Sequence, residues 1–557
     1  MAASRGGEGA AAPTNALVTP MLTDLYQITM AYAYFRAGKH EDTAVFDVFF
    51  RKNPFNGEYA VFAGLDEVLR FIHAYRFTAD DVDKLRVILG GRCEDAFFDY
   101  LAALDMSQLK VYAIAEGTVV FPRVPLLRLE GPVGVVQLLE TTILSLVNYA
   151  SLVATNAARH RQAVGPDKQL LEFGLRRAQG PDGGVSAARY AYLGGFDATS
   201  NVAAGSIFDM PVKGTHAHSF VSSFTSFDEV EGRTLERAAG NGSAVELAPL
   251  VLDKLALIQS IPALRALVGD DTNRSELAAF VAYALAFPRG FLALVDTYDV
   301  MRSGLPNFMA VALALIELGY APLGLRLDSG DLAYLSKQCR EIITLTGQVL
   351  VPDQVDALAK VSIVASNDIH EDVLLSLNEQ GHAIDAFGIG THLVTCYKQP
   401  ALGGVYKLVE MNGTPRIKLS EDVAKVTIPG KKQAFRIFGK EGLALLDLIM
   451  GENEEPPRAG QRILCRHPFA ESKRAFVVPT RVERLLNVVW DGALVDPLPA
   501  RPHIAPAREH CRKSISRMRQ DHLRPLNPTP YKVSVSDELY TFIHQLWLEE
   551  APVGELS

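Results

Sequence analysis

The feature that most constrains this chain is an alternation of short apolar runs with helix-like patterns between residues 170 and 390. Strand and helix signals that alternate in this way are typical of βα units, whose strands lie parallel in one sheet. A set of seven candidate strands favours a barrel or partial barrel over a short open sheet. The candidates are Leu170–Leu175, Gly195–Ala198, Val212–Ser219, Phe291–Asp296, Pro322–Asp328, Lys360–Ser366 and Ala386–Gly390.

Different patterns flank this region. A helix is expected to open near Pro20, with Thr23 or Asp24 as its cap, and an alternating run at 44–50 predicts a strand. After residue 403 a hairpin is expected to turn at Asn412–Gly413. The predicted domains are a disordered tail (1–19), an α+β domain (20–155), an α/β barrel (156–400) and a β-rich domain with terminal helices (401–557). An insertion loop is expected within 224–274.

Composition narrows the class of protein. The chain has 55 Lys and Arg residues and 64 Asp and Glu residues, and the resulting net charge of −9 argues against nucleic acid as a partner. The basic stretch 500–530 is expected to be solvated surface. The five cysteines are scattered, which predicts a reducing compartment without disulfides or a cysteine zinc site. No uncharged apolar stretch of about 18 residues and no signal-peptide core is evident, so we expect no membrane span and a cytosolic location.

Two histidines at spacing two, His216 and His218, lie in the third candidate strand. If Val212–Ser219 is a strand, both imidazoles point to the same face. Histidine can take a proton, a metal ion or a phosphoryl group near neutral pH. A pair of hydrogen-bonded structural histidines is the equally open alternative at this point.

Polar clusters follow the other candidate strands. In α/β barrels functional residues lie at the carboxyl ends of the strands, because the loops there share one mouth. Those positions here carry Arg176–Arg177, Asp197–Asn201, Thr215–Ser219, Asp296–Thr297, Arg326–Asp331, Ser366–Asp368 and Gly388–Thr391.

The types of these residues indicate an anionic ligand. Arg176 and Arg326 can each grip a carboxylate or phosphate with two hydrogen bonds, although either could instead form an ion pair with a nearby Asp. The small residues and the hydroxyl of 388–391 suit a phosphate group. Ser329–Gly330–Asp331, at the expected start of a helix, could bind a phosphate in the same way. Asp296 and Asp328 either hold Mg²⁺ on a diphosphate or cap helices. The sequence has neither a P-loop nor a Rossmann glycine motif.

Five motifs in order carry a family resemblance: Thr23–Gln27 (TDLYQ), Gly174–Gly180 (GLRRAQG), Gly214–Ser219 (GTHAHS), Arg326–Asp331 (RLDSGD) and Gly388–Thr391 (GIGT). The chain resembles nicotinate phosphoribosyltransferases from about residue 20 to beyond 430. The resemblance implies an irregular α/β barrel of the type II phosphoribosyltransferase kind, and a head-to-tail homodimer with its active site at the subunit interface. It implies ATP-assisted transfer of phosphoribose from phosphoribosyl diphosphate to nicotinate, giving nicotinate mononucleotide and diphosphate for NAD salvage, with Mg²⁺ or Mn²⁺ as the cofactor.

The resemblance also implies residue roles. His218 is the residue phosphorylated by ATP, and Tyr26 stacks on the pyridine ring from the partner subunit. Thr215 and Arg326, with Arg176 beside them, hold the nicotinate carboxylate, and Thr391 binds the phosphoribosyl phosphate.

Physical reasoning adds further expected roles. The positive charge that develops on the ribose is stabilised by Asp296. Ser219, a neutral hydroxyl near arginines, favours an acid over an amide substrate. The expected phosphoribosyl diphosphate contacts are Ser329, Gly330, Asp331, Gly388, Gly390 and Thr391, with Asp296 and Asp328 as the metal ligands.

Two alternatives stay open at the level of sequence. A metal-dependent amidohydrolase would use His216 and His218 as zinc ligands, but it needs further histidines and an aspartate at later strand ends. A non-catalytic homologue would keep the fold as a binding or scaffold protein.

Overall fold

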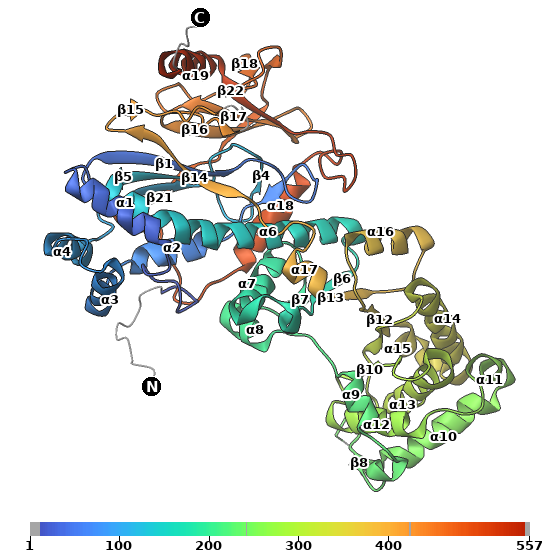
Figure 1. Ribbon diagram of the computed structural model, residues 1–557. Coiled ribbons are helices and arrows are strands. Elements are labelled where there is room, and N and C mark those ends of the chain that lie inside the picture. The colour runs from blue at the N-terminus through green and yellow to red at the C-terminus, as the bar shows by residue number, and fades with distance from the viewer. Residues whose placement is uncertain (1–11, 241, 421, 423–424, 552–557) are drawn as a thin grey trace, which may run out of the picture.

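The computed structural model describes residues 12–240, 242–420, 422 and 425–551. Three six-stranded sheets organise this part of the chain, and Figure 1 shows two of them stacked at one end while the helices α9 to α15 gather at the other. The mixture of helices and sheets, with a β-rich C-terminal part, confirms the expected fold class.

The first sheet is antiparallel and draws strands from both ends of the chain. Its order is β15 (Thr414–Pro415), β14 (Gly404–Met411), β1 (Thr43–Phe50), β5 (Leu127–Pro132), β3 (Lys110–Ala113) and β21 (Asn487–Asp491). The hairpin β14–β15 turns at Asn412 and Gly413, both with positive φ, as the sequence predicts. β14 and β21 therefore add to the N-terminal sheet, although the sequence places both strands in a separate C-terminal domain.

A second sheet forms most of the C-terminal part. Its order is β19 (Arg474–Val477), β18 (Ile463–Arg466), β22 (Lys532–Ser536), β17 (Ala444–Gly451), β16 (Lys432–Phe438) and β20 (Arg481–Arg484). The helix α19 (Asp537–Glu550) packs on it through Leu539 and Ile543. Within the basic stretch 500–530, α18 (Ala505–Ser516) packs against the central domain, because Cys511 is buried and Arg508 pairs with Asp197. That stretch is thus only partly the solvated surface expected from its composition.

The central sheet is parallel throughout. Its order is β10 (Leu292–Leu294), β11 (Gly324–Leu327), β12 (Ser362–Ala365), β13 (Ala386–Ile389), β6 (Gln169–Glu172) and β7 (Ala198–Thr199). The helices that alternate with these strands are α7 (Gly180–Leu193), α8 (Val202–Phe208), α12 (Arg274–Ala286), α13 (Leu305–Glu317), α14 (Leu332–Leu350), α15 (Val355–Ala359), α16 (Glu371–Gln380) and α17 (Thr391–Thr395). Six of the seven expected strands are present, and no ladder joins β7 to β10 among the described residues.

The prediction of a strand at Val212–Ser219 is wrong. Val212 forms only an isolated bridge to Thr199, and the short helix α9 (His218–Ser222) begins where the strand was expected to end. Pro211 has no N–H to donate to a ladder, and the residues after Val212 are small or polar and offer no apolar face for a sheet. His216 and His218 therefore do not share the face of a strand.

The segment 224–274 is more ordered than an insertion loop. It contains α10 (Leu247–Ser260) and α11 (Pro262–Val268), and α10 packs on α13. Residues 1–11 of the expected tail lie outside the described residues. Within 12–19, Thr14 hydrogen-bonds Glu67 at 2.7 Å and Val18 is buried, so this part of the tail is tied to the fold.

Two helical stretches, Val133–Val164 and Val300–Glu317, are long and apolar enough to cross a membrane, and the bent pair α10–α11 would make a third if it formed one span. Their apolar windows contain at most two Asp, Glu, Lys or Arg residues, whereas the expectation of no membrane span concerned uncharged stretches. In the fold, 61% and 83% of the two apolar windows are buried.

A buried ion pair joins the N-terminal sheet to the C-terminal sheet. Lys432 of β16 lies 2.8 Å from Asp47 of β1, and both side chains are 2% exposed. Burial raises the pKa of Asp47 and lowers that of Lys432, while their mutual attraction opposes both shifts. The pair specifies which strands of the two sheets face each other.

We expect Lys432→Met to lower the unfolding free energy by about 3–5 kcal/mol, because it leaves Asp47 buried without its counter-ion. The matched control is Lys431→Met, since the partly exposed pair of Lys431 with Glu130 is worth about 1 kcal/mol or less. Denaturant and thermal unfolding measure both variants. Equal effects of the two substitutions would contradict the role given to the Lys432–Asp47 pair.

Candidate active site

The carboxyl ends of three neighbouring parallel strands meet in a hydrogen-bonded cluster. Asp296 follows β10, and its Oδ2 accepts a hydrogen bond of 2.9 Å from the backbone N–H of Asp328, which follows β11. The hydroxyl of Ser329 donates to the same oxygen. Ser366, directly after β12, donates to Asp328. The cluster exists because parallel strands in register bring their carboxyl ends to one edge.

His218 lies against this cluster. Its Nε2 is 3.6 Å from Asp328 and 3.9 Å from Asp296, and its Nδ1 is 3.0 Å from the hydroxyl of Thr297. The imidazole is 44% exposed, whereas the Asp296 side chain is 2% exposed. His218 thus presents one ring nitrogen to two carboxylates and remains accessible to a ligand.

His216 has a different environment. Its ring lies 4.8 Å from that of Tyr283 and 5.3 Å from that of Phe220. Burial, with the nearby charge of Arg326, lowers the pKa of His216 to about 4, so this imidazole is neutral at pH 7. The aromatic contacts hold α9 against α12, and so His216 positions the backbone from which His218 projects.

Arg326 and Thr215 lie next to each other at the same edge. Arg326 Nη1 is 3.4 Å from the Thr215 hydroxyl, and its buried Nε has no partner among the described residues. Burial lowers the pKa of Arg326, and the positive charge of Arg176 acts in the same direction, although Asp328 and Asp296 oppose it. Arg176 itself is exposed, in the 3₁₀ turn Leu175–Arg177. The charge of Arg176 therefore acts on Arg326.

The other two residues that were expected to contact nicotinate are Ser219 and Tyr26. Ser219 follows His218 and is exposed. Tyr26 lies on α1 (Leu25–Arg36) and is 48% exposed, and Figure 1 shows α1 at the opposite end of the molecule from α9. A single chain therefore does not bring Tyr26 to His218.

The expected phosphate-binding motifs have visible structural roles. Asp331 caps α14 by accepting from the N–H of Tyr334 at 2.9 Å, and Gly330 has φ +76°, a value that favours glycine. A Cβ at Gly388 would lie 2.4 Å from the ring of Phe173. Gly390 and Thr391 connect β13 to the short helix α17. These contacts explain the residue types without a ligand and leave the phosphate roles as predictions.

The donor set suits a hard divalent cation better than zinc. Asp296 Oδ1 is buried without a hydrogen-bond partner, and the carboxylate of Asp328 lies close by. Mg²⁺ typically takes one or two carboxylates and completes its shell with water and phosphate oxygens. No group of three His, Cys, Asp or Glu able to hold a metal ion occurs among the described residues. The zinc site of an amidohydrolase therefore lacks its ligands in this part of the chain.

Sequence reasoning missed Glu276, which lies below the cluster on α12. Its side chain is fully buried, and it accepts hydrogen bonds from Ser303 at 2.5 Å and Asn307 at 3.0 Å. Burial raises its pKa to about 7, and the charges of Asp296 and Asp299 add to the shift. Glu276 lies in the first turn of a helix, where a Glu is ordinarily explained by its favourable interaction with the helix dipole.

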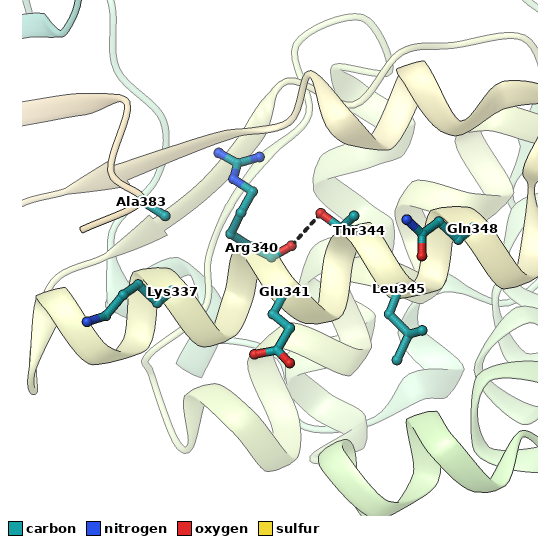
Figure 2. Close-up of a pocket in the computed structure, with 7 residues that line it drawn as sticks. All are labelled: Lys337, Arg340, Glu341, Thr344, Leu345, Gln348 and Ala383. Carbon is teal, nitrogen blue, oxygen red and sulfur yellow. Dashed lines mark hydrogen bonds between the residues drawn. The ribbon is translucent and has the colours of Figure 1, made fainter. Parts of the chain in front are cut away.

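The pocket drawn in Figure 2 is separate from the strand-end cluster. It runs along α14, where Lys337, Arg340 and Gln348 line it, and holds none of the predicted site residues. Arg340 is already paired with Asp385 at 2.5 Å. We therefore do not place the active site in this pocket.

The fold is that of a phosphoribosyltransferase with an irregular α/β barrel. The model of the nicotinate phosphoribosyltransferase N-terminal domain matches residues 21–148, and that of the C-terminal domain matches 431–543. A nicotinate-nucleotide pyrophosphorylase structure from Pyrococcus furiosus shares the fold, with TM-score 0.58 and 18% identity over 92% of this chain and 99% of that one.

Closer relatives define the family. Nicotinate phosphoribosyltransferase 2 of Arabidopsis thaliana is 59% identical over 98% of this chain and 97% of its own, and the Caenorhabditis elegans nicotinate phosphoribosyltransferase is 56% identical over 98% and 96%. The crystal structure of human nicotinic acid phosphoribosyltransferase is similar, with TM-score 0.82 and 46% identity over 94% of this chain and 99% of that one. The chain belongs to the nicotinate phosphoribosyltransferase family.

We expect Glu276→Gln to make stability less dependent on pH. Because the folded pKa is raised from 4.5 to about 7, Glu276 is favourable below pH 4.5 and its contribution is lost as pH rises through 7. Relative to the variant, the wild type should lose about 3 kcal/mol between pH 4.5 and 8. Tm measured for both proteins at pH 5 and pH 8 tests this, and a constant Tm difference would contradict it.

Proposed function

We propose that this protein is an enzyme that transfers phosphoribose from phosphoribosyl diphosphate to nicotinate and forms nicotinate mononucleotide and diphosphate. The observation that carries the proposal is the placement of His218, Asp296, Asp328 and Arg326 at one edge of the parallel sheet, in a chain of this family. The reaction belongs to the synthesis of NAD from nicotinate.

Substrate choice follows from the two arginines. Arg326 has a buried N–H without a partner, and the exposed Arg176 is close enough to influence its charge. A carboxylate satisfies both guanidinium groups, whereas the uncharged amide of nicotinamide does not. Thr215 supplies a neutral hydroxyl beside Arg326, which favours the acid. Ser219, the exposed residue after His218, stays a predicted contact of the same kind.

The transfer forms a bond between the pyridine nitrogen and C1 of the ribose while the bond from C1 to the diphosphate oxygen breaks. Positive charge develops on the ribose, and the buried carboxylate of Asp296 is oriented by the N–H of Asp328 and can stabilise that charge. Asp296 and Asp328 would hold Mg²⁺ or Mn²⁺, and the positive charge of such an ion would favour the departure of diphosphate. The predicted contacts at 329–331 and 388–391 would hold the phosphates.

We assign the phosphoryl carrier role to His218, with Nε2 as the acceptor. Thr297 occupies Nδ1, so Nε2 is the nitrogen that can attack the terminal phosphorus of ATP, with ADP as the leaving group. Asp328 lies 3.6 Å from Nε2 and can take the proton of an imidazolium from this nitrogen before the attack, which leaves the Nε2 lone pair free and the remaining ring proton on Nδ1. A phosphorylated His218 would change the charge of the diphosphate site and couple ATP hydrolysis to the transfer.

We assign to Tyr26 of a second subunit the role of stacking on the pyridine ring. It is exposed and far from His218 within one chain, so a head-to-tail homodimer would be needed to stack Tyr26 on the pyridine ring.

The activity is tested with nicotinate, phosphoribosyl diphosphate and Mg²⁺, with and without ATP, by measuring the mononucleotide. We expect the wild type to form product and to be stimulated by ATP. His218→Ala should abolish the stimulation and leave ATP-independent transfer, whereas Ser222→Ala, an exposed change on the same helix, should leave both intact. Lack of product under either condition would contradict the function, and full stimulation of His218→Ala would contradict the phosphoryl role alone.

The shared site is tested by mixing two variants that are each expected to lack the ATP-stimulated activity. Tyr26→Ala and His218→Ala, unfolded and refolded together in equal amounts, should recover roughly a quarter of the ATP-stimulated activity, since half of the randomly paired dimers carry one intact site. The matched control mixes Arg326→Ala with His218→Ala, which lie in the same chain's site and should give no recovery. Equal recovery in the two mixtures, or none in either, would rule out a Tyr26 contribution from the partner.

A further inference from the structure

A second concave site lies between the C-terminal sheet and the loops that follow β1 and β4 (Val119–Val120). Its cavity of about 780 Å³ is large enough for a phosphorylated small molecule. The N-terminal part contributes Arg51 and Arg123, and the C-terminal part contributes Lys473, Arg474 and Lys532. Glu58 is the one carboxylate among the described residues that line it. We call this site the basic pocket.

Four of the five cations that line the basic pocket have no salt bridge in the part of the chain that the structure describes. Arg51, Lys473, Arg474 and Lys532 form no salt bridge with any described residue. Arg123 stacks on Phe469 at 5.1 Å, and the charge of Asp422 acts on it. Several like charges around a cavity with apolar walls produce a positive potential that attracts anions.

Two further observations point to a missing ligand. The Nε of Arg51 and the Oδ1 of Asn53 are buried and have no hydrogen-bond partner, although such groups are nearly always satisfied in native proteins. Burial lowers the pKa of His467, and the charges of Arg123 and Lys473 lower it further, as expected where positive charge is in excess.

The basic pocket is remote from the strand-end cluster within one chain. β18 and β22, which carry some of its lining residues, lie at one end of the molecule, and α9 lies at the other end (Figure 1). His218 is the first residue of α9. None of its lining residues belongs to the site described above.

We propose that the basic pocket is a second anion site, which binds a compound with two or more linked phosphate groups, either free diphosphate or a nucleoside polyphosphate. Arg123 and Arg51 would contact the ligand from the N-terminal part, and Lys473, Arg474 and Lys532 from the C-terminal part. Such a ligand would bridge the two parts of the chain and stabilise their packing.

The test is hydrogen–deuterium exchange of the full-length protein with diphosphate, ATP or inorganic phosphate as separate probes. We expect diphosphate or ATP to protect residues 463–477 and 529–536, with monophosphate at least tenfold weaker. Protection of residues 214–222 in the same experiment reports the His218 site independently, so failure at one site is distinguishable from failure at the other. Which of the two strong probes binds at lower concentration identifies the source of the phosphates.

Variants make the assignment specific. Lys473→Glu with Arg474→Glu changes two exposed residues and should weaken the protection at 463–477 at least tenfold while the KM for phosphoribosyl diphosphate is unchanged. The matched control is Lys440→Glu, an exposed residue of the β16–β17 turn outside the pocket, which should bind as the wild type does. The proposal is overturned if the double variant keeps full protection, if the wild type shows none at 463–477, or if the KM rises in parallel with the loss, because the pocket would then belong to the catalytic site.

Discussion

The hydrogen bond from the backbone N–H of Asp328 to the carboxylate of Asp296 is the interaction on which the site depends. It joins the ends of two adjacent parallel strands and sets where both carboxylates lie. Ser366 extends the arrangement to a third strand through Asp328. His218 can face two carboxylates at once only because parallel register brings these strand ends to one edge.

The aromatic contacts of His216 complement this arrangement. The neutral imidazole of His216 packs against Tyr283 and Phe220 and anchors the turn that leads into α9. His218, two residues later, can then face the carboxylates. The two histidines, two positions apart, thus have opposite electrostatic environments. One is in an apolar setting and the other lies beside negative charge, and this difference separates a positioning residue from a proposed phosphoryl carrier.

Much of the fold follows from patterns in the sequence. Six of the seven predicted strands are present in the parallel sheet, because apolar runs between turn residues mark buried strands. The Asn412–Gly413 hairpin was predicted because I′-type turns need positive φ at both residues. The strand at 212–219 was wrong because its apolar content ends at Val212. Glu276 was missed because nothing in a helical first turn signals that the residue is fully buried.

The sequence by itself determined the alternation of strands and helices, the order of the motifs and the types of residue at the strand ends, since these depend on local periodicity and composition. Only the tertiary structure decided that β14 and β21 complete the N-terminal sheet, that Lys432 pairs with Asp47 across almost 400 residues of chain, and that His216 and His218 face different surroundings. Pairing over such separations depends on packing and desolvation, which no local pattern encodes.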